Sequence, residues 1–360
     1  MTRHKQNSFK PDWIVPPGAT IADVLEEKGW SQAEFAQRME YTTKHVNLLI
    51  QGKASITEDA AIRLERVLGS TVNFWLNREA LYREAIARKE DLLGLNGKVN
   101  WLAQLPIKEM LKWGWVNKCS EKSALVAECL KFFGVASVEA YEARYAVPVA
   151  AFRASRLEDG SRGFLTAWLR QGERVAMDVP CKPYNKEGFL AALKDLRNLT
   201  CEVDQSVFIP RLIEICAAVG VAVAIVPAPK GCAVSGATRW LGVDKALLLL
   251  SNRYKTNDQF WFSFFHEAGH LLLHGKKLMF IDIEGQFDEQ LEKEADVFAA
   301  KQLIPSEMIS ELLQLERNET AIKQFAQKVG IGPGIVVGRL QREGLLTWQE
   351  CNHLKIKIQL

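Results

Sequence analysis

One short stretch, HEAGHLLLH, holds residue types that could bind a metal ion and activate water. His266 and His270 are four residues apart, so on an α-helix both imidazoles lie on one face and can reach the same ion. Glu267 lies beside them and can act as a general base toward water held by that ion. The surrounding residues are apolar, and unpaired polar groups on such a buried helix would cost about 1–3 kcal/mol each. A metal would satisfy all three side chains, although an HExxH sequence also occurs by chance on ordinary helices.

A second, acidic helix follows and offers a third ligand. Glu292 and Asp296 are four residues apart and share one helix face. One carboxylate can complete a site of two histidines and one acid, leaving the fourth position to water, while the other orients a ligand imidazole. Glu294 points elsewhere on the helix and is the weaker candidate for third ligand. Three of the six histidines fall in the nine residues 266–274, which favours a real site over a chance motif.

These residues resemble the ImmA/IrrE family of zinc metallopeptidases, found in bacterial and phage regulators. HEAGHLLLH is followed by EKEADVFAAKQLIP, which is similar to the family's E-x-x-A-[ND]-x-F-A helix ending at a proline. The upstream runs GATRW and KALLLLSNRY are also similar, and the resemblance covers about residues 205–345. It implies one zinc ion per chain, with manganese as an alternative, and these roles: ligands His266, His270 and Glu292, base Glu267, and Asp296 supporting a ligand histidine.

Length and composition describe an ordinary globular chain. Its 360 residues are 48% hydrophobic and 25% charged, enough for two or three domains. No apolar run is long enough to span a bilayer and MTRHKQNSFKPDW lacks a signal-peptide core, so we expect a cytoplasmic protein without a membrane partner. Seven cysteines without a C-x-x-C pair argue against a cysteine-rich zinc site. Cys232 could in principle cap the metal, but a buried core thiol is the simpler interpretation.

The N-terminal part contains five short helical patterns after a flexible tail of residues 1–15. Ser31 and Glu34 form a capping box for the second helix, and Thr42 caps the third. A sharp turn at Glu40-Tyr41 separates these two helices, which describes a helix-turn-helix unit. The expected helices cover residues 21–28, 32–39, 43–50, a fourth starting after residue 57, and a fifth from about 71 to 89.

The third helix has side chains suited to DNA. Its apolar residues Val46, Leu49 and Ile50 are expected to face inward, which leaves a polar face at its N-terminal half. On that face we expect contacts to base edges from Thr42, Thr43, Lys44 and Asn47, with Gln32 and Lys53 placed to reach phosphates. Residues 1–89 hold thirteen Lys+Arg and eleven Asp+Glu, a balance of only +2, and the whole chain carries +3. Charge therefore leaves a plain helical bundle with a solvated face as an alternative.

Residues 16 to about 85 resemble the HigA-type antitoxins of the Cro/C1 (XRE) helix-turn-helix family. The shared features are the Pro-Gly start, Trp30-Ser31-Gln32, Gly52-Lys53, Ile56-Thr57, Leu68-Gly69 and FWLN at 74–77. This chain differs at the turn, where Glu40-Tyr41 replaces the usual Gly-Val. The resemblance implies a homodimer that binds palindromic operator DNA.

The spacing of apolar residues predicts the helices and strands of the rest of the chain. Residues 96–205 are expected to form a helical middle domain, a spacer or partner-binding segment without a ligand cluster. A helix at 207–219 and strands at 221–226, 234–241 and 246–251 follow. The strand before the histidine helix could bind an extended peptide at a sheet edge or could be a core strand. Residues 324–340 partly repeat the N-terminal pattern, but glycine and proline replace its polar residues, which favours a packing module.

We therefore expect a mainly helical α+β protein with three domains: a helix-turn-helix domain (16–95), a helical middle domain (96–205) and a zincin-like domain with a small sheet (206–360). The first hypothesis is a DNA-binding regulator whose C-terminal domain is a zinc endopeptidase acting on another protein. The alternative is an antitoxin or repressor that binds a toxin or other partner, with a zinc fold that does not turn over.

Overall fold

The computed structural model describes residues 14–150, 162–232, 234–251, 253, 255–274, 280–283 and 289–358. The chain forms two compact units, one of residues 1–98 with 122–124 and one of residues 99–121 with 125–360. Most of the tail expected at 1–15 lies outside the described residues. In the described part of the chain, no helix has both the length and the apolar character needed to cross a bilayer.

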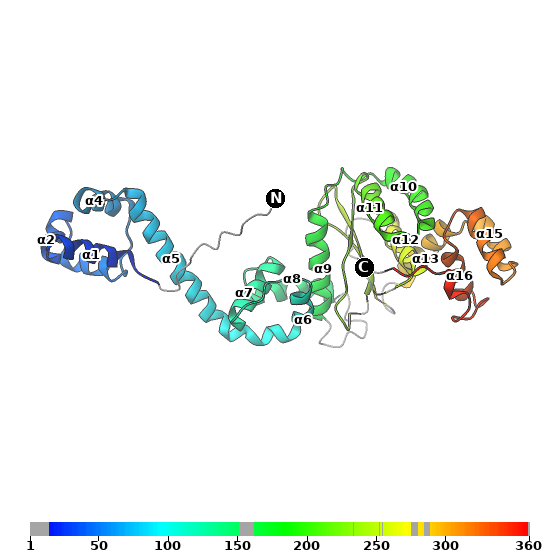
Figure 1. Ribbon diagram of the computed structural model, residues 1–360, viewed down its shortest axis with the longest axis horizontal. Helices are drawn as coiled ribbons and strands as arrows, with labels where there is room; N and C mark the ends of the chain where they lie inside the picture. The colour runs from blue at the N-terminus through cyan, green and yellow to red at the C-terminus, as the bar shows by residue number, and fades with distance from the viewer. Residues whose placement is uncertain are drawn as a thin grey trace. The chain divides into compact units, whose positions relative to one another are not determined.

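The first unit contains the five helices expected from the sequence (Figure 1). Gly29 ends the first of them in the left-handed conformation. Ser31 Oγ accepts the N–H of Glu34 at 3.1 Å, and Thr42 Oγ1 accepts the N–H of His45 at 3.2 Å, so the two expected N-caps are confirmed. The helices are α1 (Pro17–Lys28), α2 (Gln32–Met39), α3 (Thr43–Ile50), α4 (Glu58–Leu68) and α5 (Val72–Leu95).

The chain after residue 98 combines helices with one small sheet, which confirms the expected mainly helical α+β fold. The helices are α6 (Ile107–Lys112), α7 (Lys122–Phe133), α8 (Val138–Ala150), α9 (Arg162–Met177), α10 (Lys186–Asn198), α11 (Gln205–Ala217), α12 (Asn257–Leu273), α13 (Glu289–Leu303), α14 (Ile309–Leu313), α15 (Glu319–Val329) and α16 (Pro333–Arg342). The strands are β1 (Val221–Ile225), β2 (Val234–Trp240), β3 (Ala246–Leu250) and β4 (Phe280–Ile283).

The four strands form one sheet in the order β1-β3-β2-β4. β3 pairs parallel with β1 and antiparallel with β2, and β2 pairs antiparallel with β4. All five residues of β3 are buried. Because both sides of β3 are already paired, the expected addition of a peptide to this strand is wrong, and its alternative as a core strand holds. Among the described strands, β1 and β4 form the edges of the sheet.

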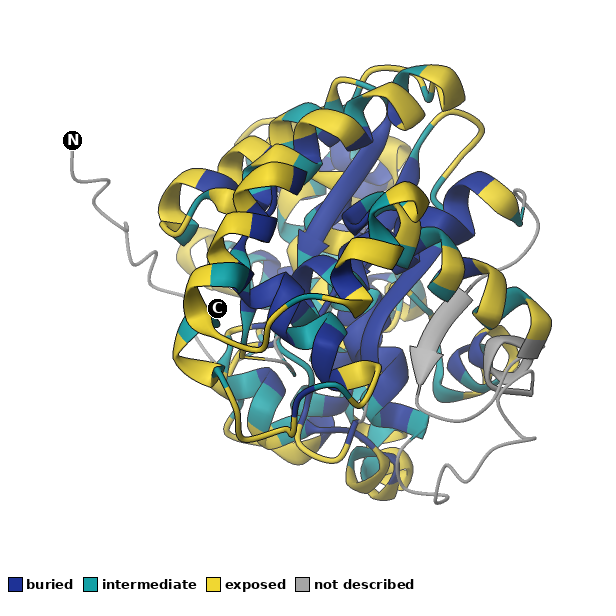
Figure 2. Ribbon diagram, turned by 90° about the vertical axis from the view of Figure 1, so that its right-hand side faces the viewer, coloured by how far each residue is buried: buried dark blue, intermediate teal, exposed yellow. Residues whose placement is uncertain are grey.

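Helices cover both faces of the sheet. Successive strand residues point to opposite faces. Leu248 belongs to the main core together with Trp261 of α12, whereas Leu249 faces α9, where a Cβ on Gly172 would lie 2.4 Å from it. Figure 2 shows buried strands beneath helices whose outer faces are exposed. The sheet therefore holds α12 from one side and is itself supported from the other.

The boundary expected at residues 205/206 does not separate two units. Trp168 of α9 is fully buried and donates its indole N–H to Val226 O at 3.0 Å. Phe189 and Leu193 of α10 belong to the same core cluster as β1, β3 and α12. The segment expected as the end of a middle domain is thus part of the unit that carries the histidine helix, because α9 packs against the sheet and α10 packs against α11 and α13.

The C-terminal helices pack on the start of α12. A Cβ on Gly338 of α16 would lie 2.6 Å from Asp258 Oδ2, so the two helices are in close contact there. Lys355 Nζ lies 2.7 Å from the same carboxylate oxygen, and both side chains are buried. The Asn257 backbone N–H donates to Ile356 O, and the Ile356 N–H donates to Asn257 Oδ1; each hydrogen bond is 2.9 Å long. The residues that partly repeat the N-terminal pattern therefore act as the expected packing module.

The most extensive contact between helices in the described part of this unit joins α12 to α13. A Cβ on Gly269 would lie 3.1 Å from Phe298 Cδ1 and 3.3 Å from Ala295 Cα. Ala295 and Ala299 are fully buried on the facing side of α13. Small residues on both helices allow the backbones to approach, and this approach brings the acidic face of α13 to the histidines.

We predict that Gly269→Val lowers the stability of this unit by about 1–3 kcal/mol, because overpacking forces the two helices apart. The midpoint of guanidinium unfolding measures the effect. Gly94→Val is the matched control, since a Cβ at this helical glycine of α5 meets nothing within 4 Å. An unchanged midpoint for Gly269→Val would contradict the importance of this contact.

Candidate functional site

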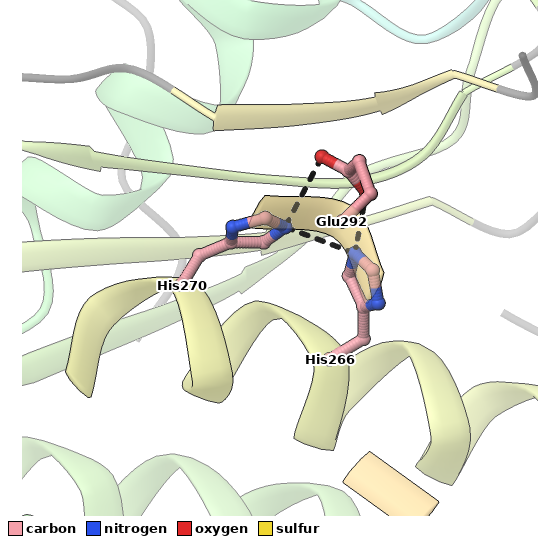
Figure 3. Close-up of side chains that lie close together, drawn as sticks. All are labelled: His266, His270 and Glu292. Carbon is pink, nitrogen blue, oxygen red and sulfur yellow. Dashed lines mark hydrogen bonds and ion pairs between the residues drawn. The ribbon is translucent and has the colours of Figure 1, made fainter. Parts of the chain in front are cut away.

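Three side chains from α12 and α13 bring nitrogen and oxygen atoms to one point (Figure 3). His266 Nε2 and His270 Nε2 are 3.0 Å apart. Glu292 Oε2 lies 3.1 Å from His266 Nε2, and Glu292 Oε1 lies 3.4 Å from His270 Nε2. The two imidazoles rise from successive turns of α12, and the carboxylate reaches them from α13. The helical spacing of four residues thus produces the geometry that it predicts.

The donor set fits a tetrahedral metal ion. Bonds of about 2.0–2.2 Å would separate neighbouring ligand atoms by about 3.3–3.6 Å, within a few tenths of an ångström of the observed spacings. Glu292 Oε1 is buried without a hydrogen-bond partner among the described residues. Two imidazoles and one carboxylate are also the ligand types that zinc accepts. The arrangement could hold one divalent cation through three protein ligands.

Electrostatics keep this donor set in the forms that bind metal. Burial alone would raise the pKa of Glu292, but the adjacent imidazoles of His266 and His270 outweigh burial and lower the pKa to about 2. Burial lowers the pKa of His270, against the opposing effect of Glu292. Near neutral pH the carboxylate is therefore ionised and His270 is neutral, with a lone pair available for a metal.

Asp296 lies behind His266, at the ring nitrogen that faces away from the cluster. Its Oδ1 is 3.0 Å from His266 Nδ1, and its Oδ2 accepts a hydrogen bond of 2.6 Å from Arg342 Nη2. Burial would raise the pKa of Asp296, but the contacts with His266 and Arg342 lower it. The Arg342 guanidinium also lies 5.0 Å from the ring centroid of Phe262. An ionised Asp296 favours the tautomer of His266 with Nδ1 protonated and Nε2 free.

His274 is a residue to which sequence analysis assigned no role. It follows His270 by four residues, and its Nδ1 lies 2.9 Å from His270 Nδ1. Its Nε2 lies 3.3 Å from Glu294 Oε2. Glu294, the weaker candidate for third ligand, therefore contacts His274 and is outside the group formed by His266, His270 and Glu292. His274 follows His270 at the same spacing of four residues that separates His270 from His266. This helical spacing alone predicts that the His274 ring lies beside His270.

Glu267 is fully buried between α12 and β2. A Cβ on Gly236 of β2 would lie 2.3 Å from Glu267 Oε1 and 2.6 Å from its Cγ. The absence of a side chain at Gly236 therefore creates the space that the Glu267 carboxylate occupies. Glu267, the expected base, directly follows His266 in the sequence. The position of its carboxylate also depends on Gly236, a strand residue whose role the sequence did not indicate.

Cys232, the alternative cap for a metal, is not part of the converging group. It is largely buried, and burial raises its pKa to about 12. Burial therefore disfavours the thiolate form of Cys232 in the metal-free protein. Its interpretation as a core thiol is the one that the structure favours.

In the first unit, the residues expected to contact DNA are all exposed. Val46 and Leu49 are buried on the opposite side of α3, and Ile50 is half-buried. Asn47 Oδ1 accepts a hydrogen bond of 2.6 Å from Gln51 Nε2, which orients the amide. The exposed residues are Gln32, Thr42, Thr43, Lys44, Asn47 and Lys53.

The turn before α3 forms without the glycine that is usual there. Glu40 adopts φ 55° and ψ 39°, a left-handed conformation that is uncommon for residues other than glycine. Tyr41 N–H bonds Ala36 O at 2.9 Å and closes the end of α2. Arg63 of α4 donates to Met39 O at 3.0 Å and to the Glu40 carboxylate at 2.8 Å. A cation from α4 thus supports the conformation of the turn.

Comparison with known proteins identifies both parts of the chain. Residues 21–75 match the helix-turn-helix family, and residues 234–341 match the IrrE N-terminal-like domain. The uncharacterized HTH-type transcriptional regulator YddM of Escherichia coli strain K12 is 38% identical over 73 residues, which are 20% of this chain and 78% of YddM. Both resemblances inferred from the sequence are therefore confirmed.

Two solved structures are also similar to the N-terminal part. One is an addiction module antidote protein of the HigA family from Coxiella burnetii, 29% identical, covering 23% of this chain and 92% of that chain with a TM-score of 0.22. The other belongs to a plasmid maintenance system of Nostoc punctiforme and is 33% identical, covering 21% of this chain and 84% of that chain with a TM-score of 0.21.

We predict that Gly236→Ala destabilises this unit by about 1–3 kcal/mol, because the new methyl group overlaps the Glu267 side chain. The cost should largely disappear in a Glu267→Ala background, where the overlapping atoms are absent. Guanidinium unfolding of the two single variants and the double variant measures this coupling. Gly242→Ala is the control, since a Cβ there meets nothing within 4 Å. Equal costs for Gly236→Ala in both backgrounds would contradict the contact.

Proposed function

We propose that this chain, which belongs to the helix-turn-helix transcriptional regulators and also carries an IrrE N-terminal-like domain, is a DNA-binding regulator that contains a zinc endopeptidase. The observation that carries the peptidase is the convergence of two imidazole nitrogens and a carboxylate on one point beside a buried glutamate. The exposed polar face of α3 supports the DNA-binding half.

His266, His270 and Glu292 would hold the metal, and Asp296 would keep His266 in the tautomer that binds it. A zinc ion at this point would supply Lewis-acid polarisation of a peptide carbonyl and of a water molecule. The ionised Glu292 would offset part of the charge of the divalent cation. Three protein ligands are the number found in catalytic zinc sites, whereas structural zinc sites have four.

Glu267 would act as the proton carrier of the reaction. Its carboxylate takes a proton from the attacking water while the water oxygen forms a bond to the peptide carbonyl carbon. The same carboxylic acid then returns the proton to the amide nitrogen as the carbon–nitrogen bond breaks. Its close packing against Gly236 limits the space available to the carboxylate, which favours proton transfer in a defined geometry.

The DNA-binding half would work as a dimer on a palindromic operator. Residues 1–89 carry a charge balance of only +2, so one copy offers few phosphate contacts. Two copies on two half-sites would double those contacts and read two sets of base edges. The protein substrate would then be a partner in the same regulation, such as a repressor or a toxin.

We predict that Glu267→Gln abolishes proteolysis and leaves zinc binding intact, because the amide cannot accept the proton and is not a ligand. Zinc content is measured by mass spectrometry of the purified full-length chain. Proteolysis is measured by comparing new protein N-termini in bacterial cells that express the wild type or the variant. His266→Ala is the second variant and should lose both zinc and cleavage.

New N-termini that persist with Glu267→Gln would contradict the assigned base. A zinc-loaded wild type that generates no new N-termini relative to either variant would favour the alternative, a regulator that binds its partner without turnover. A wild type without zinc would overturn the metal centre itself.

We predict that Asn47→Ala reduces the preference for the DNA upstream of the protein's own gene over scrambled DNA, by about 1–3 kcal/mol, because Asn47 would bond a base edge. Lys53→Ala should weaken binding to both DNAs equally and reduce the salt dependence by about one unit of slope, since Lys53 would contact a phosphate. Fluorescence anisotropy at several salt concentrations measures both effects.

Lys89→Ala is the control for the change of charge, because Lys89 is exposed in the last third of α5, outside the expected DNA-binding face. An Asn47→Ala variant that weakens binding to both DNAs equally would contradict base contact. Equal effects of Lys53→Ala and Lys89→Ala would contradict the assigned phosphate contact.

A further inference from the structure

His270 and His274, one helical turn apart at the end of α12, form a line of contacts that leads away from the metal-binding point toward Glu294. His270 Nδ1 lies 2.9 Å from His274 Nδ1, and the ring centroids are 5.0 Å apart. His274 Nε2 lies 3.3 Å from Glu294 Oε2, while Gln290 Nε2 donates to Glu294 Oε1 at 3.2 Å. The His274 side chain is only 2% exposed, and that of Glu294 is 45% exposed. A buried imidazole thus connects His270 to a carboxylate at the surface.

We propose that His274 and Glu294 are positioning residues that hold His270 in the tautomer that presents Nε2 to the metal. This inference rests on the proposed metal centre. A neutral imidazole carries one proton, so a metal-binding Nε2 requires the proton on Nδ1. His270 Nδ1 must then donate, and His274 Nδ1 is the acceptor at hydrogen-bond distance. The proton of His274 is consequently on Nε2, where Glu294 accepts it.

The tautomer of His266 is held by a carboxylate in the same way, but without an intervening histidine. There a carboxylate, Asp296, contacts the ring directly, and Arg342 holds that carboxylate in place. On α13, Asp296 is one turn after Glu292 and faces the same side, whereas Glu294 points to another side of the helix. Glu294 therefore contacts His274, and the extra imidazole of His274 bridges the remaining distance to His270.

The geometry separates this role from that of a metal ligand. His274 Nδ1 contacts the nitrogen of His270 that is on the far side of the ring from Nε2, so one imidazole lies between His274 and the metal-binding point. Glu294 contacts His274 and not the two Nε2 atoms. Polar groups that support a ligand histidine in this way typically change metal affinity by 10–100-fold when they are removed.

The test measures zinc affinity of the full-length chain by competition with a chromophoric chelator. His274→Ala removes the acceptor and should weaken zinc binding by about 10–100-fold. His274→Asn places an amide oxygen near the position of Nδ1 and should restore most of the affinity. Glu294→Ala should cost less than His274→Ala, because water can replace this half-exposed carboxylate. His353→Ala is the matched control, since His353 forms an exposed pair with Glu319 at 3.0 Å and should bind zinc as the wild type does.

A second measurement reports the tautomer of His270 directly and depends on neither proteolytic activity nor zinc affinity. Nitrogen-15 NMR of histidine side chains should show His270 protonated on Nδ1 in the zinc-loaded wild type and in His274→Asn. In the zinc-free chain, His274→Ala should shift His270 toward the Nε2-protonated tautomer. The unfolding midpoints of the zinc-free variants identify any general loss of structure.

A wild type that does not bind zinc would overturn the proposed metal centre itself. A wild type that binds zinc, with His274→Ala equal to it in affinity and tautomer, would overturn only the present inference. His274→Asn no better than His274→Ala would also overturn it, because the acceptor would then not be the property that matters. Zinc loss in His353→Ala equal to that in His274→Ala would assign the effect to histidine content rather than position.

Discussion

Close contact between α12 and α13 is the constraint on which the convergence of His266, His270 and Glu292 depends. His266 and His270 share a helix face by their spacing alone, but the carboxylate must come from another helix. Gly269 lies between the two histidines in this contact, and a Cβ there would already press on α13. Because Gly269 and the buried Ala295 are small, the helix axes approach and a glutamate reaches both imidazoles. The sheet beneath and the helix α16 beside them hold α12 in the orientation that makes this contact productive.

The cost of burying so many polar groups explains why they form a connected network. Glu267, His266 and His270 are almost completely buried, and burial of an unpartnered charge or dipole is unfavourable by several kcal/mol. Each ring nitrogen that faces away from the cluster meets another polar group, either Asp296 or His274. The network meets solvent most fully at Arg342 and Glu294, whose side chains are about half exposed. Such a network restricts the orientations of the buried imidazoles, because each hydrogen bond limits the positions that its partner can adopt.

The sequence predicted the elements that carry local signals and missed those set by packing. Capping residues placed the ends of α2 and α3 to the residue, and the spacing of four residues identified the two histidines and the two acidic residues that contact them, Glu292 and Asp296. The roles of Gly236 and Arg342 could not be predicted, because a strand glycine and a helix-end arginine carry no local mark of the side chain that they will contact. The domain boundary predicted at residues 205/206 was wrong for a related reason. The apolar faces of α9 and α10 show that these helices pack against something, but periodicity does not show which element that is. The edge assignment for β3 failed because strand order is a property of the whole sheet.

The two copies of the helix-turn-helix pattern show how a few side chains decide the use of the same local fold. α3 keeps its N-terminal half polar and exposed, so it can enter a groove of DNA. α16 has glycines at Gly334 and Gly338, and Cβ atoms there would collide with Asn257 and Asp258 at the start of α12. The absence of side chains therefore allows α16 to lie against the histidine helix, and Arg342 in its last turn can then hold Asp296. A surface that would read bases in one context has become the support of a buried polar site in the other, because close backbone approach leaves no room for the residues that recognise DNA.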